Sequence, residues 1–233
     1  MSPGAARAAR WRGDLAVALL ALAALAAWEL SGLDLTLARQ WGDASGFAWR
    51  DHVLTAGVLH QGGRWLAGLL LVLLAWDAWR PLVPGPARAR RAFGLAVVLG
   101  TMILVPLHKR ISLTSCPWSL REFGGVADYV PHWLPGVPDG GPGGCFPSGH
   151  AVAAFAFFGV YFLWRDHRPA FARAALVAVL VAGALYAWAQ MARGAHFLSH
   201  SLWTAWLCWV LTAAAFAGAD ARGRAGGAQP LAG

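Results

Sequence analysis

Residues 145–150 read Cys145-Phe146-Pro147-Ser148-Gly149-His150, and an apolar run over residues 151–164 follows at once. Proline, serine and glycine before an uninterrupted hydrophobic segment predict a loop that enters a helix N-terminus, with Ser148 as the cap. The free N–H groups and dipole of such a terminus attract anions. His150 can exchange a proton near neutral pH. The stretch indicates either a phosphate site with an acid–base group in its wall or a membrane helix that is simply capped by serine.

The composition indicates a membrane protein. Of 233 residues, 58% are hydrophobic and 13% are charged, which is too apolar for an ordinary soluble domain. Six apolar runs predict an all-α, polytopic bundle of six transmembrane helices, with flanking residues completing the shorter runs. The runs are Leu15–Leu30, Trp65–Trp79, Ala92–Leu107, Ala151–Trp164, Ala174–Gln190 and Phe197–Gly218. We expect one integral-membrane domain over residues 1–233, with a cytoplasmic leader at 1–14 and a flexible tail at 219–233.

The first run also resembles a cleaved signal peptide, because a basic leader precedes it and its end is rich in alanine. We favour a retained span, since Trp28 and Glu29 are poorly placed beside a small-residue cleavage site. The remaining topology is the same in both cases.

The basic residues predict the orientation. A net charge of +8 would suit nucleic acid, but the positions of the charges indicate membrane topology, so we expect no nucleic-acid partner. Twelve of the 19 Lys and Arg residues lie on one side of the predicted bundle, which the positive-inside rule makes cytoplasmic. They are Arg7, Arg10, Arg12, Arg80, Arg88, Arg90, Arg91, Arg165, Arg168, Arg173, Arg222 and Arg224. Both termini are then cytoplasmic in a bacterial-type inner membrane.

Three polar stretches meet on the opposite, extracytoplasmic side in this topology. Lys109 ends the third span, a long loop rich in glycine and proline leads to His150, and Arg193–His200 joins the fifth and sixth spans. A loop of that length with many turn residues fits a functional surface loop. Ionisable residues at membrane depth are usually functional, which favours the phosphate-site interpretation. Residues 31–64 are expected to form an outer segment whose aromatic residues anchor at the membrane surface.

These residues resemble the type-2 phosphatidic acid phosphatase superfamily, which includes bacterial lipid phosphatases and the vanadium haloperoxidases. Its three motifs are Lys-x6-Arg-Pro, Pro-Ser-Gly-His and Ser-Arg-x5-His-x3-Asp. The second matches in full at 147–150, whereas the first reads Lys109-x6-Cys116-Pro117. The third has His196 at the nucleophile position, His200 in place of Asp and Gln190 in place of Arg.

The resemblance implies phosphoester hydrolysis through a phosphohistidine, with a phosphorylated lipid as substrate and no metal or cofactor required. His196 would attack phosphorus, and His150 would protonate the leaving group and then help to activate water. The phosphate-binding groups would be Lys109, Arg193, Ser148 and Gly149, the last two through their amides.

The departures from the family pattern can be interpreted physically. If helical geometry continued through 190–200, then Gln190, Arg193, His196 and His200 would share one face, and Arg193 could replace the missing Arg. A neutral His200 can orient His196 but brings no negative charge. Arg110 or Arg121 could compensate for the Arg lost at position 116.

The cysteines also divide by position. Cys116 and Cys145 lie in the outer loop, where an oxidising compartment allows a disulfide, and we expect them to be joined. Cys208 lies alone in the sixth span and is expected to be a packing residue.

Three alternatives stay open. A phosphotransferase would use the same residues, and an inactive member would only bind phosphorylated lipid. His196 and His200, four residues apart, could instead ligate a metal, or haem in a membrane electron carrier, where His150 is the available partner. The lipid substrate and the oligomeric state are beyond what the sequence indicates.

Overall fold

Long apolar helices make up most of the chain in the computed structural model, which describes residues 3–134 and 136–227. Within those residues, five helices are long and apolar enough to cross a membrane, as expected for a membrane protein. They are α1 (Pro3–Ser31), the continuous helix of η1 (Val53–Gly62, a π-helix) and α3 (Gly63–Trp79), α4 (Arg88–Lys109), α7 (Pro169–Ala192) and α8 (Leu198–Gly227). The predicted helical architecture is confirmed.

The fourth predicted span is different from the other five. It consists of α5 (Val152–Phe155) and α6 (Phe158–Trp164), separated by a turn, and this apolar segment is shorter than the roughly 20 residues that a spanning helix needs. Most of its side chains are buried among the surrounding helices. The expectation of six long spans is therefore not confirmed. A central segment packed on all sides by protein does not have to extend across the lipid.

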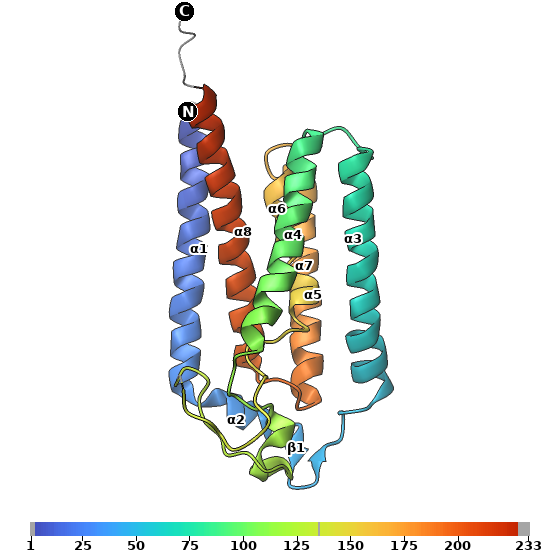
Figure 1. The fold of residues 1–233 in the computed structure, drawn as a ribbon, viewed down its shortest axis with the longest axis vertical. Coiled ribbons are helices and arrows are strands. Elements are labelled where there is room, and N and C mark those ends of the chain that lie inside the picture. The colour runs from blue at the N-terminus through green and yellow to red at the C-terminus, as the bar shows by residue number, and fades with distance from the viewer. Residues whose placement is uncertain (1–2, 135, 228–233) are drawn as a thin grey trace, which may run out of the picture.

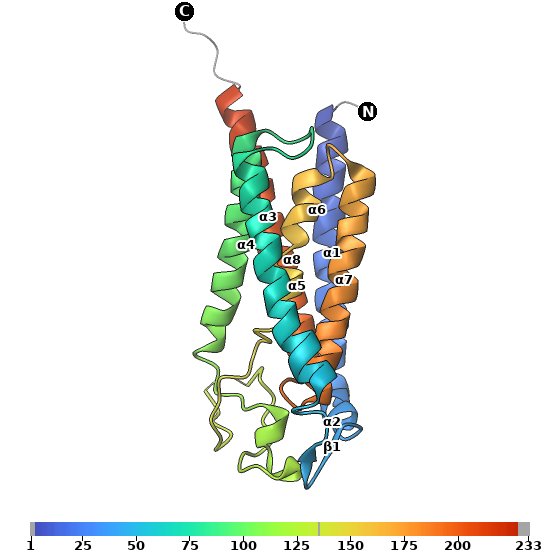
Figure 2. The same cartoon turned by 90° about the vertical axis from the view of Figure 1, so that its right-hand side faces the viewer.

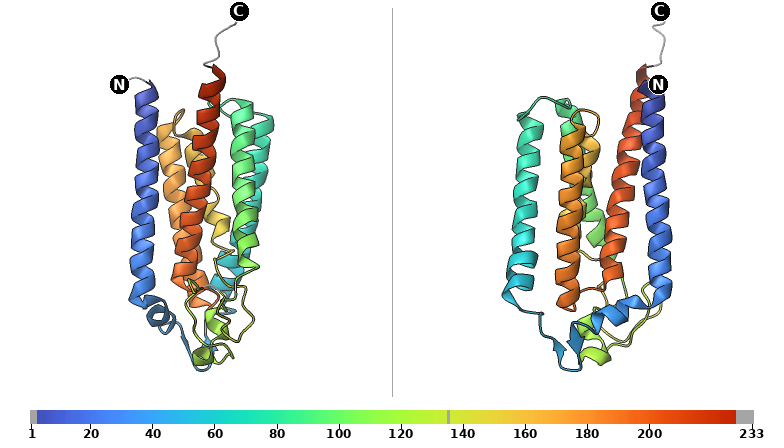
Figure 3. Two further views of the ribbon diagram at one scale, coloured as in Figure 1. Left: turned by 60° about the vertical axis from the view of Figure 1, so that its left-hand side comes forward. Right: turned by 180° about the vertical axis from the view of Figure 1, so that it is seen from behind.

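The helices form an upright bundle with polar loops gathered at one end. Figure 1 shows the N-terminal end of α1, the C-terminal end of α8 and the α3–α4 and α6–α7 connections together at the opposite end. Figures 1 and 3 show α1 beside α8 on one flank and α3 on the other, with α4 to α7 between them. The core between them includes Val98 of α4, Phe155 of α5, Val179 of α7 and Cys208 of α8. Cys208 is a buried free thiol, which agrees with its predicted packing role.

One glycine permits a close helix approach in this core. A Cβ atom on Gly183 of α7 would lie 2.2 Å from the ring of Phe155. Only a glycine at this position lets α5 lie against α7, because two carbon atoms cannot approach that closely.

The loop end is a small folded cap, visible at the bottom of Figure 2. It contains α2 (Leu33–Ala38), a hairpin of β1 (Gly42–Asp43) and β2 (Gly46–Phe47), and the short helices η2 (Pro117–Ser119) and η3 (Arg121–Phe123). Phe47, Leu120, Phe123 and Phe197 form its buried centre. The cap joins residues 32–52 to the long loop and to the α7–α8 turn.

Several element boundaries differ from the prediction. The second spanning helix begins at Val53 rather than Trp65, so His60 and Arg64 belong to it and not to an outer surface segment. At the two chain ends, α1 already begins at Pro3 and α8 continues to Gly227, so most of the predicted leader and residues 219–227 of the predicted tail are helical. Residues 1–2 and 228–233 lie outside the described residues.

We predict that the loop end faces the extracytoplasmic side, because the basic residues concentrate at the other end. A single cysteine introduced as Val126→Cys, which is exposed in the cap, should react with an impermeant thiol reagent in intact cells. Leu82→Cys, exposed in the α3–α4 connection, is the matched control and should react only after the membrane is opened. The reverse pattern would show that the orientation is wrong.

Candidate active site

A cavity of about 370 Å³ lies next to the cap, between η1, α4, α7 and the turn that precedes α5. It brings together most of the residues that the motifs single out. The residues around it are His60, Arg64, Lys109, Cys116, Trp118, Gly149, His150, Ala153, Gln190, Arg193, Ala195 and His196.

The α7–α8 turn positions His196. Helix α7 ends at Ala192, and Gly194 has a φ of 68°, a conformation that favours glycine. The amides of Ala195 and His196 then donate to the carbonyl of Gln190, at 2.9 and 3.2 Å. Helical geometry therefore does not continue from 190 to 200, contrary to the hypothesis of a shared helix face. The tight turn still directs Gln190, Arg193 and His196 to the cavity.

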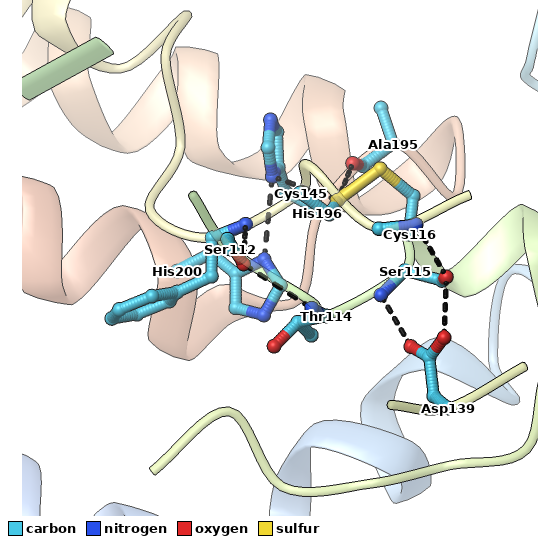
Figure 4. The surroundings of a disulfide bond; sticks show 11 residues. Ser112, Thr114, Ser115, Cys116, Asp139, Cys145, Ala195, His196 and His200 are labelled. Atoms are coloured by element: carbon cyan, nitrogen blue, oxygen red, sulfur yellow. Dashed lines mark hydrogen bonds between the residues drawn. A yellow bond between two sulfur atoms is a disulfide. The ribbon is translucent and has the colours of Figure 1, made fainter. Parts of the chain in front are cut away.

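His196 and His200 form a buried pair. Their Nδ1 atoms are 3.3 Å apart, and neither side chain is more than 4% exposed. A dashed line joins the two rings in Figure 4. His200 is not among the residues that line the cavity, so it contacts His196 from behind. Burial holds the pKa of His196 well below its usual value, and the positive charge of Lys109 lowers it further. His196 is therefore neutral, as a nucleophile must be, and with Nδ1 engaged, Nε2 is the nitrogen available for attack.

A disulfide between Cys116 and Cys145 links two parts of the long loop and lies beside the histidine pair (Figure 4). The Sγ atom of Cys145 lies 3.5 Å from His196 Nδ1 and 3.1 Å from the carbonyl oxygen of Ala195. Beside it, the buried carboxylate of Asp139 accepts hydrogen bonds from the amide and hydroxyl of Ser115. The Cys position of the first motif, where the family has Arg, thus contributes a covalent link to the site.

Cys145, His196 and His200 place three potential metal-ligating atoms within 4.8 Å of one another. Because the Cys145 sulfur is bonded to Cys116, it is not a thiolate and is a poor ligand. Two histidines whose Nδ1 atoms face each other are better explained by a mutual hydrogen bond than by a shared metal.

His150 lies against the helix that the sequence placed outside the site. Its Nε2 is 3.3 Å from the carbonyl oxygen of Leu59, and its ring contacts His60 and Tyr186 with centroids 4.5 and 4.9 Å away. Burial lowers the pKa of His150 to about 4, and positive charge on the nearby side chains of His60, Arg193 and Arg64 also lowers it. His150 is therefore neutral in the unliganded protein at neutral pH.

Three cationic side chains line the cavity: Arg64, Lys109 and Arg193. Arg193 donates its Nε–H to the carbonyl of Arg50 at 2.7 Å, which orients its guanidinium. Neither Arg110 nor Arg121 lines the cavity, so the hypothesis that one of them replaces the missing Arg is wrong. Arg121 instead pairs with Asp128 at the exposed surface.

Arg64 and His60 are the site residues that the motifs missed. They are four residues apart on one helix and therefore share its cavity-facing side. The available signal was an Arg beside the apolar run at 65–79, since an ionisable residue in a membrane-spanning helix is usually functional.

The loop before α5 contributes differently from the prediction. Helix α5 begins after Ala151 without a side-chain cap, so Ser148 is not its N-cap. The Ser148 amide donates to the carbonyl of His200 at 3.1 Å, which leaves no free amide there for a phosphate. Gly149 lines the cavity, and its amide has no acceptor among the described residues. Of the two predicted amide donors, only Gly149 is placed to bind an oxyanion.

Comparison with known proteins agrees with these motifs. A family model for the PAP2 superfamily matches residues 91–224, which is more than half of the chain. The chain belongs to the PAP2 superfamily. Membership of this superfamily indicates phosphatase or phosphoesterase activity. The match runs from α4 to α8 and includes Lys109, His150 and His196, whereas the helix that carries His60 and Arg64 precedes it. No curated protein and no solved structure matches the chain.

We predict that anion binding protonates His150. A bound dianion offsets the positive charges that depress its pKa, so the bound-state pKa exceeds the free value of about 4. Between the two values the free protein is neutral at His150 and the bound protein is protonated, so affinity should rise as pH falls through that window. Sulfate carries no titrating proton there, and calorimetry at about pH 5.5 in buffers of different ionisation enthalpy should show proton uptake.

His150→Phe should abolish that proton uptake, whereas His167→Phe, an exposed histidine at the other end of the bundle, should leave it unchanged. Proton uptake that persists in His150→Phe would assign it to a different group.

We also predict that Arg64 binds phosphate. Its guanidinium has no acidic partner among the described residues and lines the cavity, so Arg64→Gln should weaken inorganic phosphate binding about tenfold or more, the value of one charge-assisted hydrogen bond. Arg121→Gln removes an equal charge outside the cavity and should have little effect. Equal effects of the two substitutions, measured by calorimetry, would show that only net charge matters.

Proposed function

We propose that this protein is a membrane lipid phosphate phosphatase that hydrolyses a phosphomonoester or diphosphate through a phosphohistidine at His196. The observation that carries the proposal is the placement of a neutral, buried imidazole in the wall of a cavity that also holds three cationic side chains. Cations attract the phosphoryl oxygens, while a neutral imidazole keeps the lone pair that attacks phosphorus.

Four of the lining residues can form a phosphate-binding site. Lys109, Arg64 and Arg193 approach from α4, α3 and the α7–α8 turn, so they surround a bound group from three elements. The Gly149 amide adds a neutral donor. The hydrogen bond to the Arg50 carbonyl orients Arg193 before substrate arrives, and a preorganised donor of this kind stabilises developing negative charge with little reorganisation.

His150 is placed to assist the leaving group. A bound phosphate raises its pKa, which lets the imidazole carry a proton to the departing oxygen. After the alcohol leaves, the neutral imidazole can take a proton from a water molecule, and the oxygen of that water can then attack the phosphohistidine. The contact with Leu59 and the ring contacts with His60 and Tyr186 hold the imidazole in place. No metal is required in this sequence of steps.

The surroundings of the cavity support a lipid substrate. One wall is formed by the η1–α3 helix, a candidate membrane span. Apolar side chains on this helix are exposed, among them Val58 at 56% and Trp65 at 73%. Such surface faces hydrocarbon in a bilayer, so a lipid head group can approach the cavity while its chains stay in the membrane.

The test is phosphate release by purified protein from a panel of phosphorylated lipids in detergent micelles: phosphatidic acid, phosphatidylglycerol phosphate, a polyprenyl diphosphate and lipid A. We expect metal-independent release from at least one of them, undiminished by a chelator. His196→Ala should lower turnover to background because the attacking nitrogen is removed, and no phosphorylated protein should be trapped. His167→Ala, a surface histidine, is the matched control.

Normal turnover by His196→Ala would refute the nucleophile assignment. Binding without release would identify a protein that only recognises phosphorylated lipid. Transfer of the phosphoryl group to a second lipid in place of water would identify a phosphotransferase.

A further inference from the structure

His200 has a buried nitrogen that lacks a partner. The side chain is fully buried, its Nδ1 contacts His196 Nδ1, and its Nε2 has no hydrogen-bond partner among the described residues. If His200 Nδ1 accepts the proton on His196 Nδ1, then its own Nε2 must carry a proton. A buried donor without an acceptor is costly, so the pair calls for a third group on the far side of His200.

His132, from the long loop, lies beside His200. The two rings are perpendicular, with centroids 5.2 Å apart. His132 also stacks on Phe146 at 3.9 Å and 15°, and this contact sets the plane of its ring. Phe146 directly precedes the Pro147–His150 motif, so the same loop that positions His150 positions His132.

His132 is in turn paired with an acidic residue of α1. Its Nε2 lies 3.1 Å from Glu29 Oε1, an ion-pair contact rather than an aligned hydrogen bond, and both side chains are no more than 10% exposed. The same carboxylate oxygen accepts the indole N–H of Trp203 at 2.9 Å. With its Nε2 proton directed at Glu29, His132 keeps an Nδ1 lone pair that can accept from His200.

We propose that Glu29 and His132 are positioning residues that supply, through His200, the negative charge absent from the position next to the nucleophile. This inference rests on the proposed function. In the proposed series, which requires the His200–His132 ring contact and the His132–Glu29 ion pair to tighten into hydrogen bonds, every imidazole donates toward Glu29: His196 Nδ1–H to His200 Nδ1, His200 Nε2–H to His132 Nδ1, and His132 Nε2–H to the carboxylate. One consistent set of tautomers leaves His196 Nε2 unprotonated.

The positive charge of the cavity explains why a carboxylate behind His196 would assist the reaction. Its described lining includes Arg64, Lys109 and Arg193 but no Asp or Glu. Attack by a neutral imidazole generates a cationic phosphoimidazolium, which these cations disfavour. A carboxylate reached through polarised hydrogen bonds offsets that charge from behind the ring.

His196 Nε2 forms a bond to phosphorus as the P–O bond to the lipid breaks, and the departing oxygen keeps that electron pair and takes a proton from His150. The Nδ1 proton of the phosphoimidazolium remains shared with His200. Water then forms a new P–O bond, its proton passes to His150, and the N–P electron pair returns to Nε2.

The experiment measures kcat and KM for phosphate release from phosphatidic acid in micelles by the full-length protein. Glu29→Gln keeps the shape and an acceptor for Trp203 but removes the charge, and should lower kcat about tenfold with KM unchanged. His132→Phe retains stacking on Phe146 and should have the same effect. In a His200→Asp background a carboxylate contacts His196 directly, so Glu29→Gln should then have no effect on kcat.

Asp34→Asn is the matched control. This buried carboxylate lies at the same end and accepts the Trp28 indole N–H at 3.0 Å and the Ser199 amide at 3.1 Å through one oxygen. The Asn oxygen keeps both bonds and the residue contacts no histidine in the series, so kcat should be unchanged. An unchanged kcat in Glu29→Gln, or equal losses in both backgrounds, would overturn the inference and leave the phosphatase intact. Absence of phosphate release by the wild-type protein would instead refute the proposed function.

A second comparison applies if His200→Asp does not fold. Residues in one series are not additive, so Glu29→Gln combined with His132→Phe should be no slower than either single variant. Multiplicative losses would overturn the inference.

Discussion

The hydrogen bond from the Ser148 amide to the carbonyl of His200 joins the two halves of the site. Both partners lie where the chain is irregular or just re-entering a helix, and unsatisfied backbone groups are costly at membrane depth. The hydroxyl of Thr204 donates to the carbonyl of Ser148, which ties the same loop to the next turn of α8. Non-helical backbone can therefore enter the bundle because α8 satisfies it, and this fixes His150 relative to His196.

This constraint explains why the central segment is short. The non-helical residues 145–151 fill part of the length of the bundle, so α5 and α6 need to cover only the rest of that length. The surrounding helices bury them and remove the need to face lipid. The helical segment is short because the loop before it enters the bundle, which places Gly149 and His150 inside the protein rather than at its surface.

The electrostatic character of the site follows from which groups are excluded from it. Three cations line the cavity, and the described lining contains no acidic side chain. Such a field attracts phosphate and keeps buried imidazoles neutral, but it opposes the positive charge that a phosphohistidine develops. The carboxylate of Glu29, on α1, lies outside the cavity and pairs with His132, whose ring contacts His200. His200 is thus linked by ring contact and ion pair to residues far away in the sequence.

The sequence by itself determined the class of protein and identified the residues from which its site could be built. Apolar runs predicted the long helices because a bilayer requires them. The Pro147–His150 motif, Lys109 and His196 predicted a single site, and Lys109, Gly149, His150 and His196 lie around one cavity. Only the tertiary structure decided the length of the fourth helical segment, the exclusion of the Ser148 amide and the entry of Arg64 and His60 into the site. These depend on burial and on contacts between distant elements. A local pattern of residues carries no record of which neighbour will satisfy a backbone group or which helix will close a cavity.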